Sequence, residues 1–234
     1  MRECYQPCIA VIPAAGIGSR MQADRPKQYL TLFGKTVLEH TVNKLLGSGL
    51  FTHILIAVAK DDPYFDDMAI SEHPQVIRVD GGRERADSVL SALCYAASHL
   101  SAHWVAVHDA ARPCIQIDDI KKVLNQAEQH GAILACPVRD TMKWSEDKNA
   151  IEYTLDRRQM WHAMTPQVFP LSTLKHGLEK ALSNGVLITD EASVFEWLGH
   201  KPLLVTGRSD NIKITQPEDL ALAEFYLSRE KETA

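Results

Sequence analysis

The sequence lacks the signatures of several large classes of protein. No stretch approaches the ~20 consecutive apolar residues that a membrane-spanning helix needs. The amino terminus does not show the basic start and apolar core of a secretory signal. Neither an HExxH motif nor a cysteine pair with CxxC spacing is present, which excludes the common zinc sites. Internal repeats and low-complexity segments are also missing. These absences predict a cytoplasmic protein with no membrane partner.

Positive charge is also scarce. Lys and Arg number 25 against 30 Asp and Glu, which gives a net charge of −5. Proteins that bind nucleic acid usually carry a basic surplus, so we expect no nucleic-acid partner. A small anionic ligand is not excluded, because a binding site needs local rather than net positive charge. The five cysteines are odd in number and scattered, which is typical of free thiols in a reducing compartment.

What is present is the composition of a globular α/β protein. The 234 residues are 45% hydrophobic, and this length predicts a single domain, 1–234, without room for a fused second enzyme. Short apolar runs alternate with segments of helical periodicity, which predicts a mostly parallel sheet flanked by helices. The strands are expected at 8–13, 54–59, 76–80, 104–108 and 132–138, with short extended pieces at 203–206 and 211–214. The helices are expected at 36–48, 86–98, 118–129, 171–182, 190–198 and 217–229.

Local signals predict several element ends. Thr36 and Glu39 have the spacing of a capping box, Gly131 is expected to stop the helix at 118–129, and Thr189 is an ordinary cap for the next-to-last helix. Residues 139–159 break the alternation with polar sequence around a turn-like centre. We expect a protruding β-hairpin arm there, which could cover a neighbouring subunit; a solvated loop is the alternative.

The segments after the predicted strands carry glycine and charged residues, and open parallel sheets bind their ligands at these carboxyl ends. The first such segment, 13–21, reads P-A-A-G-I-G-S-R-M. Its glycines let the backbone approach an anion, while Arg20 and Lys27 supply positive charge. The third glycine of GxGxxG is missing, so a plain turn is an alternative. Small residues at Ala14 and Ala15, together with the two cations, favour phosphate binding.

Two later strand ends have similar features. Gly81 and Gly82 predict a turn against which something packs, with Ser88 close enough to reach a ligand; an ordinary glycine turn fits equally well. Asp109 ends an apolar strand, where packing explains a carboxylate poorly, and it could hold Mg²⁺ with phosphate oxygens completing the shell. Arg112 suits a bidentate grip on a second phosphate.

Two further positions have competing interpretations. Asp210 lies near Lys213 and could complete a two-carboxylate metal site, but taken alone it is better explained as part of a turn-forming Asp-Asn pair before a helix. His108 precedes Asp109, and we expect it to be a structural histidine whose hydrogen bonds are satisfied.

These blocks resemble a known enzyme family. The opening, with P-K-Q-Y at 26–29, is similar to that of nucleotidyltransferases, which move a nucleoside monophosphate onto a phosphate. The later blocks resemble the 2-C-methyl-D-erythritol 4-phosphate cytidylyltransferases, in order along nearly the whole chain: D-G-G-R-E-R-A-D-S-V (80–89), V-H-D-A-A-R-P (107–113), P-V-R-D-T-M-K (137–143), T-P-Q-V-F (165–169), I-T-D-E-A-S (188–193) and D-N-I-K-I-T-Q-P-E-D-L (210–220).

The resemblance implies a Rossmann-like fold, a homodimer locked by the arm, and Mg²⁺-assisted transfer of CMP from CTP to methylerythritol phosphate in isoprenoid precursor synthesis. It assigns CTP binding to Ala14, Ala15, Gly16, Gly18, Gly82 and Ser88. It assigns catalysis to Arg20, Lys27 and Lys213, and metal binding to Asp109 and Asp210. It assigns the polyol phosphate to Arg112, Thr141, Thr165, Thr189 and Lys213, with Arg157 reaching over from the partner's arm.

The same resemblance implies a mechanism without a general base. A phosphate monoester is already largely dianionic at neutral pH, so its oxygen can attack the α-phosphorus of CTP directly. Positioning and electrostatic stabilisation then supply most of the catalysis. Two alternatives stay open: a cytidylyltransferase for another polyol phosphate, such as ribitol 5-phosphate, and a non-catalytic nucleotide-binding protein on the same fold.

Overall fold

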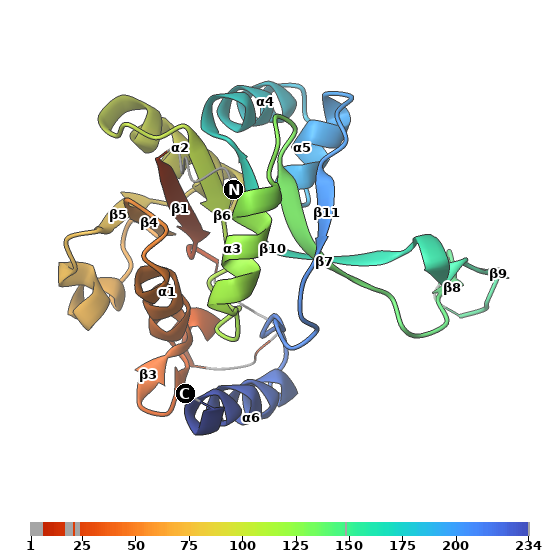
Figure 1. Ribbon diagram of the computed structural model, residues 1–234, viewed down its shortest axis with the longest axis horizontal. Helices are drawn as coiled ribbons and strands as arrows, with labels where there is room; N and C mark the ends of the chain where they lie inside the picture. Colours follow the sequence, from red (N-terminus) through yellow and green to blue (C-terminus); the bar gives the residue numbers. More distant parts are fainter. Residues whose placement is uncertain (1–6, 17–20, 22–23, 148, 234) are drawn as a thin grey trace.

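The computed structural model describes residues 7–16, 21, 24–147 and 149–233, and Figure 1 shows its arrangement. Within these residues, seven strands form the main sheet in the order β11-β7-β10-β6-β1-β4-β5. β10 runs antiparallel to its neighbours β6 and β7, whereas each of the other adjacent pairs is parallel. The strands are β1 (Cys8–Pro13), β4 (Ile54–Val58), β5 (Val76–Asp80), β6 (Trp104–Val107), β7 (Ala132–Pro137), β10 (Trp161–Pro170) and β11 (Leu203–Thr206).

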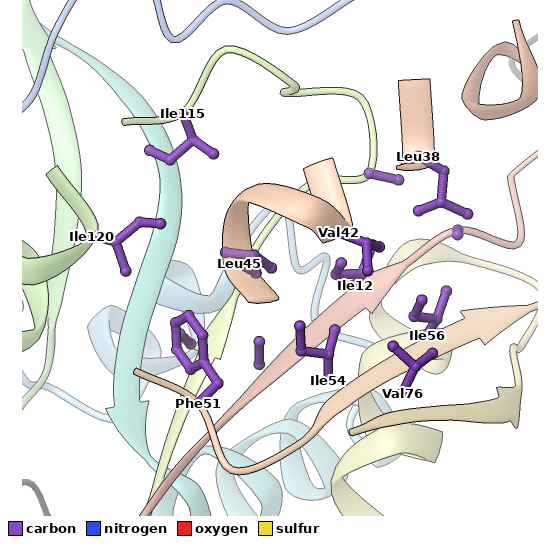
Figure 2. Close-up of a cluster of buried hydrophobic side chains, with 14 of the residues drawn as sticks. Ile12, Leu38, Val42, Leu45, Phe51, Ile54, Ile56, Val76, Ile115 and Ile120 are labelled. Atoms are coloured by element: carbon purple, nitrogen blue, oxygen red, sulfur yellow. The ribbon is translucent and has the colours of Figure 1, made fainter. Parts of the chain in front are cut away.

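Helices cover both faces of the sheet because its central strands are apolar along their whole length. One face packs against α1 (Val37–Ser48) and α3 (Ile117–Gln126), and the other against α2 (Arg85–His99), α4 (Leu171–Ser183) and α5 (Glu191–Trp197). Figure 2 shows Val42 of α1 close to Ile12 of β1, and Leu38 of α1 belongs to the same buried cluster. The last helix, α6 (Glu218–Thr233), packs in a separate cluster with Val37 and Ile214.

The chain order places a ligand site at the centre of this sheet. From β1 the chain adds β4 and β5 on one side, and it then crosses to place β6 on the other side of β1. Such a reversal opens a crevice beyond the carboxyl ends of the two central strands. Residues after Pro13 and after Val107 therefore meet at the same edge. No helix in the described part of the chain is long and apolar enough to span a membrane.

The predicted α/β class with a mostly parallel sheet is confirmed, and the capping box of α1 is present. Thr36 Oγ1 accepts a hydrogen bond from the Glu39 N–H at 3.1 Å. Two predicted helix ends are wrong. α3 ends at Gln126 because Ala127 turns extended, well before Gly131. The cap of α5 is Asp190 rather than Thr189, since the Asp190 carboxylate accepts from the Ser193 N–H at 3.0 Å.

The strand content differs from the sequence prediction in two places. Residues 211–214 form no strand, although the Ile214 N–H donates to Ala111 O at 2.8 Å. β10, which the sequence did not predict, is a ten-residue strand in the middle of the sheet. The sequence does not indicate a strand here, because the segment contains two prolines and a Thr-Pro-Gln run, and proline is normally absent from central strands. The structure tolerates Pro166 because the register of β10 shifts between Ala163 and Gln167.

A hairpin arm projects from the sheet between β7 and β10 (Figure 1). It carries the two-residue strands β8 (Lys143–Trp144) and β9 (Tyr153–Thr154), which pair antiparallel, so the predicted hairpin is present. The remaining short elements are β2 (Thr31–Leu32), β3 (Lys35–Thr36) and the 3₁₀ turns Lys27–Tyr29, Phe65–Asp67, Ala69–Glu72 and Arg157–Gln159.

Candidate active site

Two glycine-containing loops pack together beyond the carboxyl ends of β1 and β5. A Cβ added to Gly81 would lie 2.5 Å from the Ala15 Cβ and 3.1 Å from the Val58 carbonyl. A Cβ added to Gly82 would lie 2.3 Å from the Asp87 Cβ. Close approach therefore requires glycine at both positions, in agreement with the predicted packed turn. The Ser88 hydroxyl accepts a hydrogen bond from the Gly82 N–H at 3.1 Å, which ties the turn to α2.

These loops line what we call the first hollow. Gln28 holds the loop after β1, because its amide donates to Ala14 O at 2.7 Å and to Gly16 O at 3.1 Å. Lys27 faces the same space and donates to Ile214 O at 2.8 Å. The structure brings these residues of the predicted site together around the hollow: Ala14, Ala15, Gly16, Lys27, Gly82, Ser88, Asp109 and Lys213.

Cations surround the Asp109 carboxylate. Its Oδ1 lies 3.1 Å from Arg85 Nε, and its Oδ2 lies 2.9 Å from Lys213 Nζ and 3.4 Å from Arg112 Nε. Burial opposes ionisation of this carboxyl, but the charges of Arg85, Lys213 and Arg112 outweigh it and hold the pKa of Asp109 well below its ordinary value. Asp109 therefore stays ionised and draws positive groups from three parts of the chain into one cluster.

Arg85 is held from behind by Glu191. The guanidinium donates two hydrogen bonds to the Glu191 carboxylate, at 2.6 and 2.9 Å, while its Nε faces Asp109. Burial disfavours the charge on Arg85, but the attraction of Glu191 and Asp109 dominates and raises the pKa of the guanidinium. Glu191 is only 2% exposed and lies in the first turn of α5. Sequence reasoning gave neither residue a role, because nothing local signals a pair 106 positions apart.

A second hollow lies on the other side of this cluster. It is lined by Arg112, Thr165 and Thr189, and it shares Arg85, Asp109 and Lys213 with the first hollow. Gln167 of β10 positions its wall: it donates to Asp190 Oδ2 at 2.8 Å and accepts from the Ala192 N–H at 2.9 Å. The two hollows thus meet at one charged wall, which suits two anionic ligands that must come into contact.

Thr165 lies at the register shift of β10 and is fixed by hydrogen bonds. Its hydroxyl oxygen accepts from the Asp109 N–H at 3.0 Å and lies 2.8 Å from His108 Nδ1. Its carbonyl accepts from the Asn211 side chain at 2.8 Å. His108 is fully buried, its Nε2 lies 3.2 Å from Arg112 O, and burial lowers its pKa to about 4. The histidine therefore has partners on both ring nitrogens, as the sequence predicted.

Several predicted residues lie away from the two hollows. Asp210 forms an ion pair with Arg208 and lines a separate hollow with Tyr226 beneath α6. Thr141 and Arg157 are exposed on the arm, where the Arg157 guanidinium donates to Arg139 O. Gly18 and Arg20 fall outside the described residues. The roles of all these residues stay predictions.

Comparison with known proteins agrees with this geometry. A sequence profile of the 2-C-methyl-D-erythritol 4-phosphate cytidylyltransferase family matches residues 8–229. The proteins of that name from Vibrio cholerae and Vibrio atlanticus are similar to this chain. The first is 62% identical over 225 residues, 95% of this chain and 97% of the relative; the second is 60% identical over 235 residues, 99% and 100%.

Solved structures show the same relationship. A crystal structure of 4-diphosphocytidyl-2C-methyl-D-erythritol synthase superimposes with a TM-score of 0.83 at 36% identity, over 95% of this chain and 98% of the other. The Francisella tularensis 2-C-methyl-D-erythritol 4-phosphate cytidylyltransferase superimposes with a TM-score of 0.79 at 35% identity, over 94% and 99%. With the profile match and these identities, the chain belongs to the 2-C-methyl-D-erythritol 4-phosphate cytidylyltransferase family.

Proposed function

We propose that this protein transfers CMP from CTP to 2-C-methyl-D-erythritol 4-phosphate, giving 4-diphosphocytidyl-2-C-methyl-D-erythritol and pyrophosphate for isoprenoid precursor synthesis. The observation that carries the proposal is the charged wall of Arg85, Asp109 and Lys213, which lines both hollows. A nucleotide in the glycine-lined first hollow and a polyol phosphate in the second would meet there. The names of the similar proteins support the choice of CTP and of the polyol.

The chemistry is in-line attack of a phosphate oxygen of the polyol on the α-phosphorus of CTP. This oxygen needs no general base, because the phosphate monoester is largely dianionic at pH 7. The obstacle is the repulsion between two polyanions. Arg112 and Lys213 reach the second hollow, while Lys27 reaches the first, so positive charge is available to both ligands. The protein contributes orientation and charge stabilisation, with Arg20 assigned to the triphosphate by the resemblance.

A divalent cation fits this arrangement if phosphate oxygens supply most of its ligands. No group of three or more His, Cys, Asp or Glu side chains suited to a metal occurs among the described residues. Asp109 provides one ionised carboxylate at the shared wall, and Mg²⁺ commonly binds through one or two carboxylates plus substrate phosphates. We infer that Asp109 holds the ion, and Asp210 stays proposed from the resemblance alone. The bound ion would supply positive charge at the triphosphate.

The arm is proposed to join two copies of the chain. It exposes Trp144 and Tyr153, whose rings stack with centroids 6.2 Å apart, and Trp161 at its base is also exposed. Exposed aromatic side chains grouped on a projecting element are typical of a protein interface. Arg157 would then reach the polyol phosphate of the partner, and Thr141 keeps its assignment to the polyol phosphate from the resemblance. The cytoplasmic location stays a prediction.

A panel of acceptors tests this function. The protein is incubated with CTP and Mg²⁺ and with methylerythritol phosphate, erythritol 4-phosphate or ribitol 5-phosphate, and pyrophosphate release is measured. We expect methylerythritol phosphate to give a kcat/KM at least roughly tenfold above the others, since a misfitting polyol leaves polar groups unpaired. A higher kcat/KM with ribitol 5-phosphate would show that this polyol phosphate, and not methylerythritol phosphate, is the acceptor. CTP binding without pyrophosphate release for any acceptor would indicate a non-catalytic nucleotide-binding protein.

A further inference from the structure

The loop between β11 and α6, residues 207–217, carries Lys213 but contains neither helix nor strand. Its shape therefore depends on contacts with other elements. Near α6 it is held by the Ile214 N–H, which donates to Ala111 O at 2.8 Å. In the middle of the loop lies Asn211, which is only 1% exposed and to which sequence reasoning gave no role in the site.

The side chain of Asn211 joins this loop to β10. Its Nδ2 donates to the Thr165 carbonyl oxygen at 2.8 Å, and since a carbonyl oxygen can only accept, the orientation of the amide is settled. Thr165 has no partner in the register of β6 or β7, because the pairing with β7 shifts between Ala163 and Gln167. The Asn211 amide thus supplies a hydrogen bond where the regular strand pairing is interrupted.

Packing alone does not account for an asparagine at this position. The oxygen of its amide, Oδ1, is buried, and no group in the described part of the chain donates to it. A buried polar atom without a partner lowers the stability of the fold, and an apolar side chain would avoid that cost. The property that distinguishes Asn211 from an apolar residue is therefore the hydrogen bond that it donates to Thr165 O.

The backbone of Asn211 holds Arg112. Arg112 Nη1 donates to the Asn211 carbonyl oxygen at 2.6 Å, whereas Arg112 Nε lies 3.4 Å from Asp109 Oδ2, so the carbonyl makes the shorter of these two contacts. Arg112 lines the second hollow, and a guanidinium with five N–H groups keeps others for a ligand. Asn211 itself lines neither hollow, so it can affect a ligand there only through the residues that it holds.

We propose that Asn211 is a positioning residue for the acceptor phosphate. Its side chain fixes the loop against Thr165 of β10, and its carbonyl then holds the Arg112 guanidinium in the direction from which it meets a phosphate in the second hollow. A bidentate contact between a guanidinium and a phosphate depends on orientation as well as on charge, so a small shift of the loop lowers affinity. The inference deepens the proposed function, because it takes the polyol phosphate as the ligand of the second hollow.

The first test compares the KM values of the two substrates in two variants. The side chain of Asn211→Ser is too short to reach Thr165 O, and Asn211→Asp keeps the shape of the side chain but offers only oxygens at pH 7. We expect both variants to raise the KM for methylerythritol phosphate roughly tenfold and to leave the KM for CTP within about twofold. The reason for the difference is that neither Asn211 nor Arg112 lines the first hollow.

The matched control is Asn43→Ser, at an exposed position of α1, which should leave both KM values unchanged. Urea unfolding midpoints show whether each variant is folded. A loss of folded protein lowers the amount of active enzyme and hence the apparent kcat, but it changes neither KM. An unchanged KM for methylerythritol phosphate in a folded Asn211 variant, or an equal rise in the two KM values, would overturn the proposal.

A double-mutant cycle shows whether Asn211 acts through Arg112. Arg112→Met fills a similar volume and has no donor. If Asn211 acts through Arg112, adding Asn211→Ser to Arg112→Met should change kcat/KM for methylerythritol phosphate by less than about twofold, since the group that Asn211 positions is already gone. Losses that multiply in the double variant would show that Asn211 acts on another group, which contradicts the proposal.

A third test needs no turnover. In protein with ¹⁵N-labelled arginine, a guanidinium held at Nη rotates slowly and gives separate Nη–H signals, and the signals of Arg112 are those missing from Arg112→Met. We expect separate signals in the wild-type protein and one averaged signal in Asn211→Ser. An averaged signal in the wild-type protein, or separate signals in Asn211→Ser, would refute the positioning role. If no acceptor gives pyrophosphate release, the proposed function fails, and this measurement still decides whether Asn211 positions Arg112.

Discussion

At the scale of single residues, Lys27 joins the nucleotide-side hollow to the loop that carries Lys213. Its ammonium lines the first hollow and donates to the carbonyl of Ile214, the residue after Lys213. In the proposed reaction, a cation at this place would stabilise the charge that develops on the α-phosphate and the departing pyrophosphate. The loop to which we assign the nucleotide is held instead by the Gln28 amide, which donates to Ala14 O and Gly16 O.

We therefore expect Lys27→Ala to lower kcat by roughly 10²–10³-fold, the usual cost of losing one charge-stabilising group. CTP affinity should fall far less, which calorimetry with CTP alone measures alongside pyrophosphate release. Lys35→Ala, on the exposed hairpin strand β3, is the matched control and should be close to wild type. Near-normal turnover in Lys27→Ala would remove its catalytic role.

The sequence indicates which residue types form the site but not how they pair. Asp109 could be found because packing explains a carboxylate at the end of an apolar strand poorly, and Arg112 because a guanidinium three residues later suits a second phosphate. Arg85 and Glu191 could not, since their contact depends on where α2 and α5 begin in space. Asp210 shows the converse: its spacing suggests a metal ligand, yet the local turn pairs it with Arg208.

At the scale of elements, the junction between β5 and α2 carries a sharp steric requirement. A side chain at Gly82 would collide with Asp87 in the first turn of α2, including backbone atoms at 3.1 and 3.3 Å. The helix start and the glycine turn can separate only by moving Ser88 and Arg85, which face the first hollow.

Gly82→Ala should raise the KM for CTP several-fold and destabilise the fold by roughly 1–3 kcal/mol, as expected for overpacking. Gly47→Ala is the matched control: a Cβ there would meet no described atom within 4 Å, and the residue lies inside α1. It should stabilise the protein by about 0.5–1 kcal/mol. Urea unfolding measures the stability of both variants, and rates at varied CTP concentration give their KM. An unchanged KM for CTP in Gly82→Ala would show that the loop can shift to accept a side chain without disturbing the first hollow.

Most elements could be predicted because each is buried in a regular way, on both faces for a central strand or on one side for a helix. β1 and β4 read as apolar runs since both faces are covered, and α1 shows its cap and its apolar stripe in the sequence. β10 could not be recognised, because its three parts have different surroundings. Its carboxyl-terminal part, from Gln167 onward, pairs within the central sheet, Thr165 lines the second hollow, and Trp161–Ala163 lies at the base of the arm. Thr165 and Gln167 form hydrogen bonds with polar groups of the site. Their residue types are therefore explained by these partners and not by a preference for strands.

At the scale of the whole molecule, each active site of the proposed dimer would contain residues from both chains, with Arg157 contributed by the partner's arm. If the arm crosses, a heterodimer of an Arg157→Ala subunit and a Lys27→Ala subunit contains one site with both residues intact and one site with neither. We expect such heterodimers, isolated with two different affinity tags, to recover about half of wild-type pyrophosphate release, given two equivalent interfaces.

The two variant homodimers are the controls, and each should be strongly impaired. Verified heterodimers that are no more active than these controls would show that Arg157 does not serve the partner's site. A wild-type protein that sediments as a monomer at assay concentration would exclude the arm as a dimer element altogether.

β10 has a mechanical consequence. One end, Trp161–Ala163, is hydrogen bonded to β7 at the base of the arm, and the other, from Gln167 onward, lies between β6 and β7 in the centre of the sheet. Thr165 sits where the register shifts between them. The arm is therefore connected to the centre of the sheet by a strand and not by a loop. A second copy of the chain that held the arm in the proposed dimer would therefore be joined to Thr165 by one continuous strand.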